Sequence, residues 1–310
     1  MRPAGIHPIL YAFFGPDGAL DRQAMRRQVQ ACLAGGAHGL AVPGLATEVS
    51  KLLPAERRQV VEWAAEDLAG RVPLAVTIFG RTPAEQIEAM RHAESAGAAW
   101  VVLQPPPVSG MPEEELMRFL APVLDAARIP AGLQNAPDLM SLGLSPENLA
   151  RLAAAHPSLQ VLKAEGPATL VQEVVERTSG RLAVLNGRGG LELPDNFRAG
   201  AAGMIPAPDC FDVQVQAWAA MQAGHEAEAE RLYASILPAI VFAMQGVPHL
   251  VCYGKRLVAA RLGLGPVHDR APAVLPTPFG LACVRRFAAA LGPYETIKVP
   301  SPSSSHGEKK

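Results

Sequence analysis

Eight short apolar runs, separated by segments with a helical pattern, recur along the first two thirds of this chain. Most of the runs end in glycine, proline or a polar residue, and their apolar character is continuous instead of alternating. Continuous apolar runs are typical of parallel strands that are buried on both faces. The runs cover residues 8–13, 38–44, 73–80, 99–105, 130–135, 159–165, 181–187 and 202–207.

The segments between the runs carry signals for the start and the end of helices. Thr82 and Ser145 are each followed by a proline and then by a glutamate, which predicts an N-cap with proline in the first helical turn. Gly97 and Gly180 stand where a helix would end just before the next run. The chain therefore reads as a series of β-α units.

Eight β-α units over residues 1–210 match the (β/α)8 TIM barrel, an α/β fold of usually about 250 residues. A doubly wound sheet is the alternative, but no run is followed by the glycine pattern of a dinucleotide-binding turn. The nearest candidate, 187–190, is followed by Pro194, which would break the helix early. Residues 211–292 are predicted to form a C-terminal helical region, and 293–310 a disordered tail rich in serine and proline.

Composition favours a small-molecule partner. The net charge of -1 and the pI near 6.7 give no electrostatic reason to bind nucleic acid or an anionic membrane. No apolar stretch approaches the roughly 20 residues that span a bilayer, and the N-terminus lacks a signal-peptide core. Four dispersed cysteines without a C-x-x-C pair fit a reducing compartment, so we expect a cytoplasmic protein. The histidines show no paired ligand spacing, and neither a metal ion nor a cofactor is expected.

Lys163 lies inside one of the apolar runs, 159–165, where a lysine is costly unless it has a function. Arginine supplies most of the positive charge of this chain, but arginine stays protonated. A desolvated lysine can lose its proton and attack a carbonyl. Two interpretations remain open from this segment alone: a nucleophile, or a lysine that only pairs with Glu165 at the strand end.

In a barrel the run 159–165 becomes the sixth strand, and active sites lie at the C-terminal strand ends. Side chains alternate along a strand, so Val161, Lys163 and Glu165 are expected on one face. An uncharged amine can condense with the ketone of a 2-keto acid, and the protonated imine then acts as an electron sink. The imine allows either C3–C4 cleavage or loss of a C4 hydroxyl, with Glu165 as the proton carrier.

The chain resembles the dihydrodipicolinate synthase and N-acetylneuraminate lyase family of Schiff-base barrels over nearly all of residues 5–292. Its Schiff-base lysine corresponds to Lys163. The strand-two motif G-[ST]-T-G-E corresponds to 44–48, and the strand-five motif Y-N-x-P corresponds to 134–137. Residues 253–257 and 261–264 resemble the family's C-terminal helices. This resemblance implies a lyase that acts on a 2-keto acid and forms a homotetramer.

Several departures from the family pattern shape the expected chemistry. The strand-five tyrosine, a proton relay in the family, is Gln134, which can only form hydrogen bonds. The hydroxyl pair of strand two is replaced by Leu45 and Ala46. The substrate carboxylate would therefore rely on backbone N–H groups near Ala46 and Thr47, with the Thr47 hydroxyl as an optional further donor. The arginine after Y-N-x-P and the strand-four tyrosines of dihydrodipicolinate synthase are also missing, which disfavours a role in lysine biosynthesis.

A carboxylate two residues after the lysine, without the tyrosine, resembles the branch that contains 2-keto-3-deoxy-arabonate dehydratase. The leading prediction is a Schiff-base lyase that dehydrates a 2-keto-3-deoxy sugar acid. A pyruvate-releasing aldolase and a catalytically silent sugar-acid binder are the alternatives. The predicted catalytic residues are Lys163, Glu165 and Gln134, and the predicted substrate-binding residues are Ala46, Thr47, Glu48, Gln104, Asn186 and Gly187.

Four of these residues also have a purely structural interpretation. Glu165 could serve only as the ion-pair partner of Lys163. Glu48 could accept hydrogen bonds from backbone N–H groups, and Asn186 could cap a turn. Gln104 could be a core amide whose hydrogen bonds are satisfied inside the protein.

Overall fold

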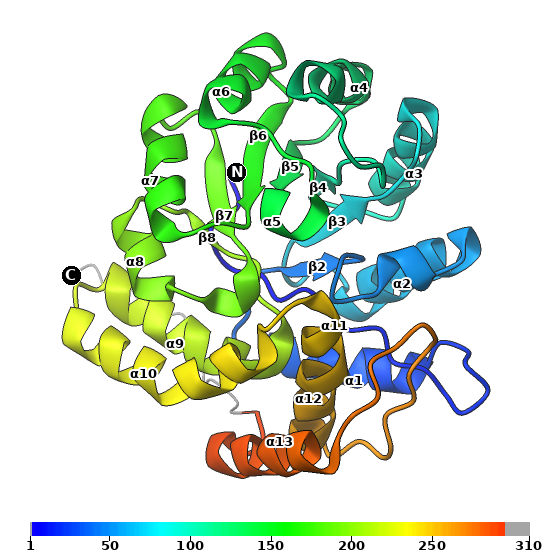
Figure 1. Cartoon of the computed structure of the whole chain (residues 1–310), viewed down its shortest axis with the longest axis vertical. Helices are drawn as coiled ribbons and strands as arrows, with labels where there is room; N and C mark the ends of the chain where they lie inside the picture. The colour runs from blue at the N-terminus through cyan, green and yellow to red at the C-terminus, as the bar shows by residue number, and fades with distance from the viewer. Residues whose placement is uncertain (1, 295–310) are drawn as a thin grey trace, which may run out of the picture.

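The computed structural model describes residues 2–294, and within them eight parallel strands form one curled sheet. The strand order is β1-β8-β7-β6-β5-β4-β3-β2, and a parallel bridge between Ile9 and Ala41 links the chain after β1 to β2. Figure 1 shows the strands at the centre with helices around them, consistent with a (β/α)8 barrel. The strands are β1 (Gly5–Ile6), β2 (Leu40–Val42), β3 (Leu74–Ile78), β4 (Trp100–Leu103), β5 (Ala131–Asn135), β6 (Leu159–Ala164), β7 (Ala183–Asn186) and β8 (Gly203–Met204).

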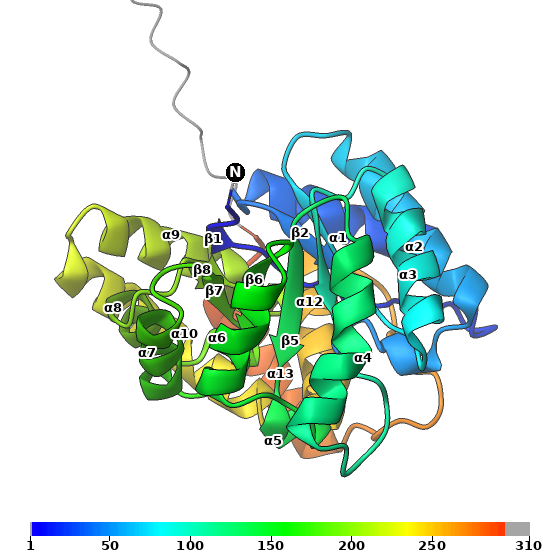
Figure 2. The same cartoon turned by 90° about the horizontal axis from the view of Figure 1, so that it is seen from above.

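Helices follow the strands along the chain and pack around the sheet, as the view from above in Figure 2 also shows. The helices between β1 and β8 are α1 (Arg22–Ala34), α2 (Pro54–Leu68), α3 (Pro83–Ser95), α4 (Glu113–Ala126), α5 (Pro137–Met140), α6 (Pro146–Ala155), α7 (Ala168–Arg177) and α8 (Leu193–Arg198). Short 3-10 turns η1 (Val49–Lys51), η2 (Arg188–Gly190) and η3 (Pro208–Cys210) follow β2, β7 and β8.

Between η3 and Tyr294 the regular elements are helices, joined by loops. Figure 1 shows them in the lower half of the view, close to α1. They are α9 (Phe211–Gln222), α10 (Glu226–Ala243), α11 (Val247–His249), the π-helical segment η4 (Leu250–Gly254), α12 (Lys255–Leu262) and α13 (Pro278–Leu291). Among residues 2–294 no single helix is long and apolar enough to cross a membrane. One sharply bent pair, 226–243 with 247–262, reaches that length and composition.

Seven of the eight predicted runs contain an observed strand, and every strand residue except Gln160 is buried. The first run was misplaced: we expected a strand over 8–13, but β1 ends at Ile6. The pairing with β8 does continue, since the backbone N–H of Ile9 donates to Pro206 O at 2.8 Å. Pro8 and Pro206 have no N–H, so the regular ladder stops early although the run itself is buried.

The predicted helix caps are confirmed. The Thr82 hydroxyl accepts from the N–H of Glu85 at 3.2 Å, and the Ser145 hydroxyl accepts from that of Asn148 at 3.4 Å. The chain then passes Gly97 at φ 89°, a left-handed conformation that favours glycine. These signals fix where each helix starts and where the chain turns into the next strand.

The predicted tail over 293–310 lies outside the described residues from 295 onward, so its disorder stays a prediction. Tyr294 is the last described residue, and it packs against the fold. Its hydroxyl donates to Pro208 O at 3.0 Å, and the guanidinium of Arg261 lies 4.0 Å from its ring centre.

Removal of one cap tests whether this local signal contributes to stability. Thr82→Ala should lower the free energy of unfolding by about 1 kcal/mol, because the N–H of Glu85 loses its acceptor. Thr82→Ser keeps the acceptor and serves as the matched control. Urea unfolding of both variants measures the difference, and equal midpoints would contradict a capping role.

Candidate active site

Lys163 and Glu165 form a buried ion pair at the C-terminal end of β6. Lys163 Nζ lies 2.8 Å from Glu165 Oε1, and the two residues are 3% and 6% exposed. The contact follows from the alternation of side chains along a strand, which puts positions 163 and 165 on one face. Because each charge is removed from water, each requires the other as a partner.

Gln134 on β5 is the strand neighbour of Lys163 and binds the same carboxylate. The register pairs Gln134 with Lys163, and Gln134 Nε2 donates to Glu165 Oε1 at 2.9 Å. Glu165 Oε1 thus accepts from an ammonium and from an amide. Gln134 Oε1 is buried and has no partner within the described residues, so it is free to accept a hydrogen bond from a ligand.

The end of β7 closes around the carboxylate of Glu165. The N–H of Arg188 donates to Glu165 Oε2 at 3.3 Å. A Cβ on Gly187 would lie 2.7 Å from Glu165 Cδ, so only glycine fits beside the carboxylate. Asn186 donates to Gly166 O and Asn196 Oδ1 and accepts from the N–H of Gly187, which uses its polar atoms inside the protein.

The loop after β2 contributes backbone to the same chamber. Ala46 lines the chamber with Lys163, but the Thr47 hydroxyl is engaged elsewhere, because it donates to Leu10 O at 2.6 Å. Among residues 2–294 the backbone N–H groups of Ala46 and Thr47 have no acceptor, whereas that of Glu48 donates to Leu45 O. The anion-binding role predicted for this loop therefore rests on two free N–H groups and not on the hydroxyl.

Glu48 and Gln104 line a different cavity. Both oxygens of Glu48 are occupied: one by Lys255 Nζ, the other by Lys51 Nζ at 2.6 Å. Gln104 is 4% exposed, and its Oε1 has no partner within the described residues. The structure therefore brings Lys163, Glu165, Gln134, Ala46 and Gly187 together, and it places Glu48 and Gln104 outside that group.

Lys255 is a residue that the sequence analysis missed. It is fully buried, and burial lowers the pKa of its ammonium, although the neighbouring Glu48 carboxylate opposes that shift. Its helical neighbours at three and four residues' distance are Val251, Cys252, Val258 and Ala259. This spacing places Lys255 on the apolar face of the segment, a signal that was available in the sequence.

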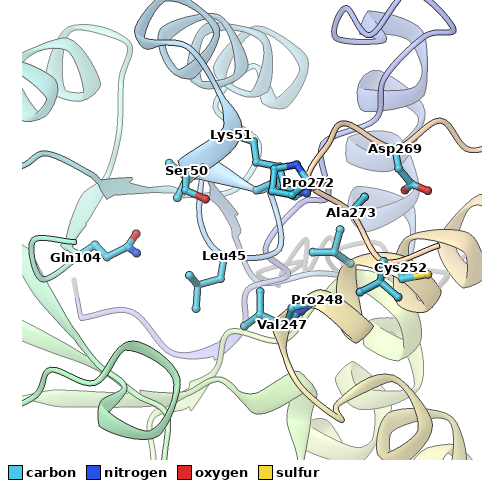
Figure 3. Close-up of a pocket in the computed structure, with 14 residues that line it drawn as sticks. Leu45, Ser50, Lys51, Gln104, Val247, Pro248, Cys252, Asp269, Pro272 and Ala273 are labelled. Atoms are coloured by element: carbon cyan, nitrogen blue, oxygen red, sulfur yellow. Dashed lines mark hydrogen bonds and ion pairs between the residues drawn. The ribbon is translucent and has the colours of Figure 1, made fainter. Parts of the chain in front are cut away.

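Two cavities meet at Leu45 and Val247. The chamber that holds Lys163 and Glu165 has a volume of about 30 Å³, close to that of one water molecule. The second cavity has about 500 Å³ and is shown in Figure 3, where Leu45 from the loop after β2 lies close to Val247 at the start of α11. A 2-keto acid therefore needs side-chain movement to reach Lys163. Met244 and Leu250, which also line the small chamber, are flexible enough to move.

Comparison with known proteins agrees with this architecture. The model of the Dihydrodipicolinate synthetase family matches residues 2–268. A 4-hydroxy-tetrahydrodipicolinate synthase from Methanothrix thermoacetophila is 28% identical over 280 residues, which is 87% of this chain and 94% of that protein. A protein of the same name from Sorangium cellulosum is 34% identical over 204 residues, 65% of this chain and 67% of that protein.

Two solved structures are similar over nearly their whole length. A putative dihydrodipicolinate synthetase from Pseudomonas aeruginosa has a TM-score of 0.86 and 26% identity, and the match covers 94% of this chain and 100% of that one. YagE from E. coli K12, solved in complex with pyruvate, has a TM-score of 0.85 and 24% identity, with 93% and 98% covered.

Gly187→Ala tests the close approach to Glu165. The added methyl group would crowd the carboxylate, and such overpacking should cost about 1–3 kcal/mol of stability. In a Glu165→Ala background the same change should cost clearly less, because the carboxylate is gone. Gly265→Ala is the matched control, since its Cβ would meet no heavy atom within 4 Å. Urea unfolding measures all costs, and an equal cost in both backgrounds would show that the contact is not made.

Proposed function

This chain belongs to the dihydrodipicolinate synthetase family, and we propose that it is a lyase that dehydrates a 2-keto-3-deoxy sugar acid through a Schiff base on Lys163. Enzymes of this family are lyases that use a lysine Schiff base. The observation that carries the proposal is the buried contact of 2.8 Å between Lys163 and Glu165, beside an amide instead of a phenol. We also propose a homotetramer, as the family resemblance implies.

The ion pair supports the first step, formation of the imine. Glu165 can take a proton from the Lys163 ammonium, which leaves a neutral amine beside a neutral carboxylic acid. The amine attacks C2 of the keto acid, and the C2 oxygen leaves as water once it has received protons. The free N–H groups of Ala46 and Thr47 are candidates to hold the substrate carboxylate during this step.

Dehydration needs one group that moves a proton from C3 to the C4 hydroxyl. Glu165 is the acid/base group nearest to Lys163 and can do both. It removes the C3 proton, the electrons enter the imine, and they then expel the C4 hydroxyl, which leaves as water with the proton from Glu165. Hydrolysis of the imine returns Lys163. For a 2-keto-3-deoxy-pentonate, loss of a C5 proton and protonation at C3 convert the C3–C4 alkene into the C4–C5 enol, which becomes the aldehyde. The net reaction releases one water molecule and keeps every carbon atom.

Aldol cleavage has a different proton requirement, because the C4 hydroxyl must lose its proton when the C3–C4 bond breaks. Gln134 occupies the position that a tyrosine holds in the family pattern, and an amide cannot take that proton. The relatives from Sorangium cellulosum and Methanothrix thermoacetophila are named synthases, so cleavage or formation of a carbon–carbon bond stays the alternative reaction.

Product analysis separates the two reactions. With a 2-keto-3-deoxy-pentonate as substrate, the product should keep the full carbon chain as a semialdehyde. Lys163→Arg should abolish turnover, because a guanidinium stays charged and cannot form the imine. Free pyruvate together with an aldehyde would contradict dehydration and establish an aldolase. In that case Gln134→Tyr should raise the cleavage rate further.

Glu165→Gln separates proton transfer from ion pairing. If Glu165 also carries the proton in the dehydration step, the variant should form the imine more slowly and lose a further factor of roughly 100 to 10,000 in turnover. A pure ion-pair role predicts instead that turnover falls only as much as the rate of imine formation. Single-turnover trapping with borohydride, compared with the steady-state rate, measures both steps. Turnover close to that of the wild type would remove Glu165 from the proposed mechanism.

A further inference from the structure

Glu48 connects two distant parts of the chain. It follows the β2 strand, and one of its carboxylate oxygens accepts from Nζ of Lys255, the first residue of α12. The other oxygen accepts from Lys51 Nζ at 2.6 Å, and that ammonium also donates to Arg270 O at 3.1 Å. The loop 44–51 is thereby joined by ionic contacts to the C-terminal region.

The outer side of the loop borders a cavity. Leu45, Glu48, Val49, Ser50 and Lys51 all line the cavity of about 500 Å³ that separates the loop from the C-terminal segments. Figure 3 shows Leu45, Lys51 and Pro272 among the side chains that line this cavity. Close-packed side chains hold most loops in place, but this loop faces a void on one side. Its position therefore depends more on its polar contacts than is usual.

The backbone of the loop is also strained. Glu48 adopts φ 57°, a left-handed conformation that is unfavourable for a residue other than glycine. Such a conformation persists only when the surroundings hold it. On the inner side the Thr47 hydroxyl binds Leu10 O at 2.6 Å, and on the outer side the carboxylate of Glu48 binds the two lysines.

Lys255, one of the two lysine partners of Glu48, is buried in the protein. The side chain of Lys255 is 0% exposed, and its Nζ lies 5.1 Å from the ring centre of Phe14. An unpaired buried ammonium is strongly unfavourable, so Lys255 keeps its contact with Glu48 as long as α12 is folded. The ion pair therefore links α12 to the loop 44–51.

We propose that Glu48 and Lys255 are positioning residues that set the direction of the free N–H groups of Ala46 and Thr47, and so determine the affinity for the substrate carboxylate. This inference rests on the proposed function, in which these N–H groups hold that carboxylate. Glu48 directly follows Thr47, so the torsion angles fixed by the ion pair lie next to the proposed anion site. Neither residue touches the reacting atoms.

A neighbouring ion pair provides a matched control. Arg256, the next residue on α12, pairs with Asp269, and both side chains are mostly buried. This pair also joins α12 to a segment beside the large cavity, and the hydrogen bonds of Arg256 go to Cys252 and Asp269 instead of the loop after β2. Its removal perturbs the same helix but leaves both charges of the Glu48–Lys255 pair in place.

The test compares two double variants, Glu48→Met with Lys255→Met, and Arg256→Met with Asp269→Met. Both charges of a pair leave together, so the variants should remain folded. Borohydride trapping at graded pyruvate concentrations gives the half-saturating concentration and the maximal trapping rate. For the Glu48/Lys255 variant we expect the half-saturating concentration to rise about tenfold or more, equivalent to 1.4 kcal/mol, with a maximal rate near that of the wild type. The control should match the wild type in both quantities.

An unchanged half-saturating concentration in the folded Glu48/Lys255 variant would overturn the inference. So would an equal rise in the control, because the effect would then be a general loosening of α12. If the double variant does not fold, Glu48→Gln keeps the shape and weakens the tie, and a rise of roughly threefold is then required. Absence of trapping in the wild type would instead refute the proposed function, and with it this inference.

Discussion

The buried ion pair between Lys163 and Glu165 is the interaction on which the rest of the site depends. Both charges lie almost out of reach of water, so each is tolerable only in the presence of the other. The neighbouring segments accommodate the pair. β5 supplies the amide of Gln134, and Gly187 directly after β7 leaves room that any side chain would take from the carboxylate. A base held at 2.8 Å from a lysine is also what imine chemistry requires.

Much of this could be predicted from the sequence, because the relevant signals are local. Period-two alternation predicted that Lys163 and Glu165 share a face, and apolar runs located seven strands. The first strand was misplaced because prolines in two paired segments remove ladder donors, which depends on a partner about 200 residues away. Glu48 was proposed as a substrate ligand, but its lysine partner lies 207 residues further along the chain. Such contacts depend on tertiary structure and leave little trace in a local pattern.

The site also differs from the family pattern in the groups that could bind the substrate carboxylate. Leu45 and Ala46 replace hydroxyl residues, so the groups left for an anion are backbone N–H groups whose direction is a property of the whole loop. If these N–H groups bind the substrate, the conformation of the loop must be held in place. The proposed ion pair between Glu48 and Lys255 of α12 does this. The C-terminal helices would then take part in substrate binding, although they are remote from Lys163 in sequence.

The central claim is that Lys163 attacks the substrate although it is buried and ion-paired. Reduction of the wild-type protein with borohydride in the presence of pyruvate, followed by peptide mapping by mass spectrometry, tests it most directly. Lys51 lines the neighbouring cavity, and Lys255 is buried against Glu48, so both lysines act as internal comparisons. The account predicts a pyruvate adduct on Lys163 and none on the other two lysines. No adduct, or an adduct on Lys51 or Lys255 in place of Lys163, would contradict it.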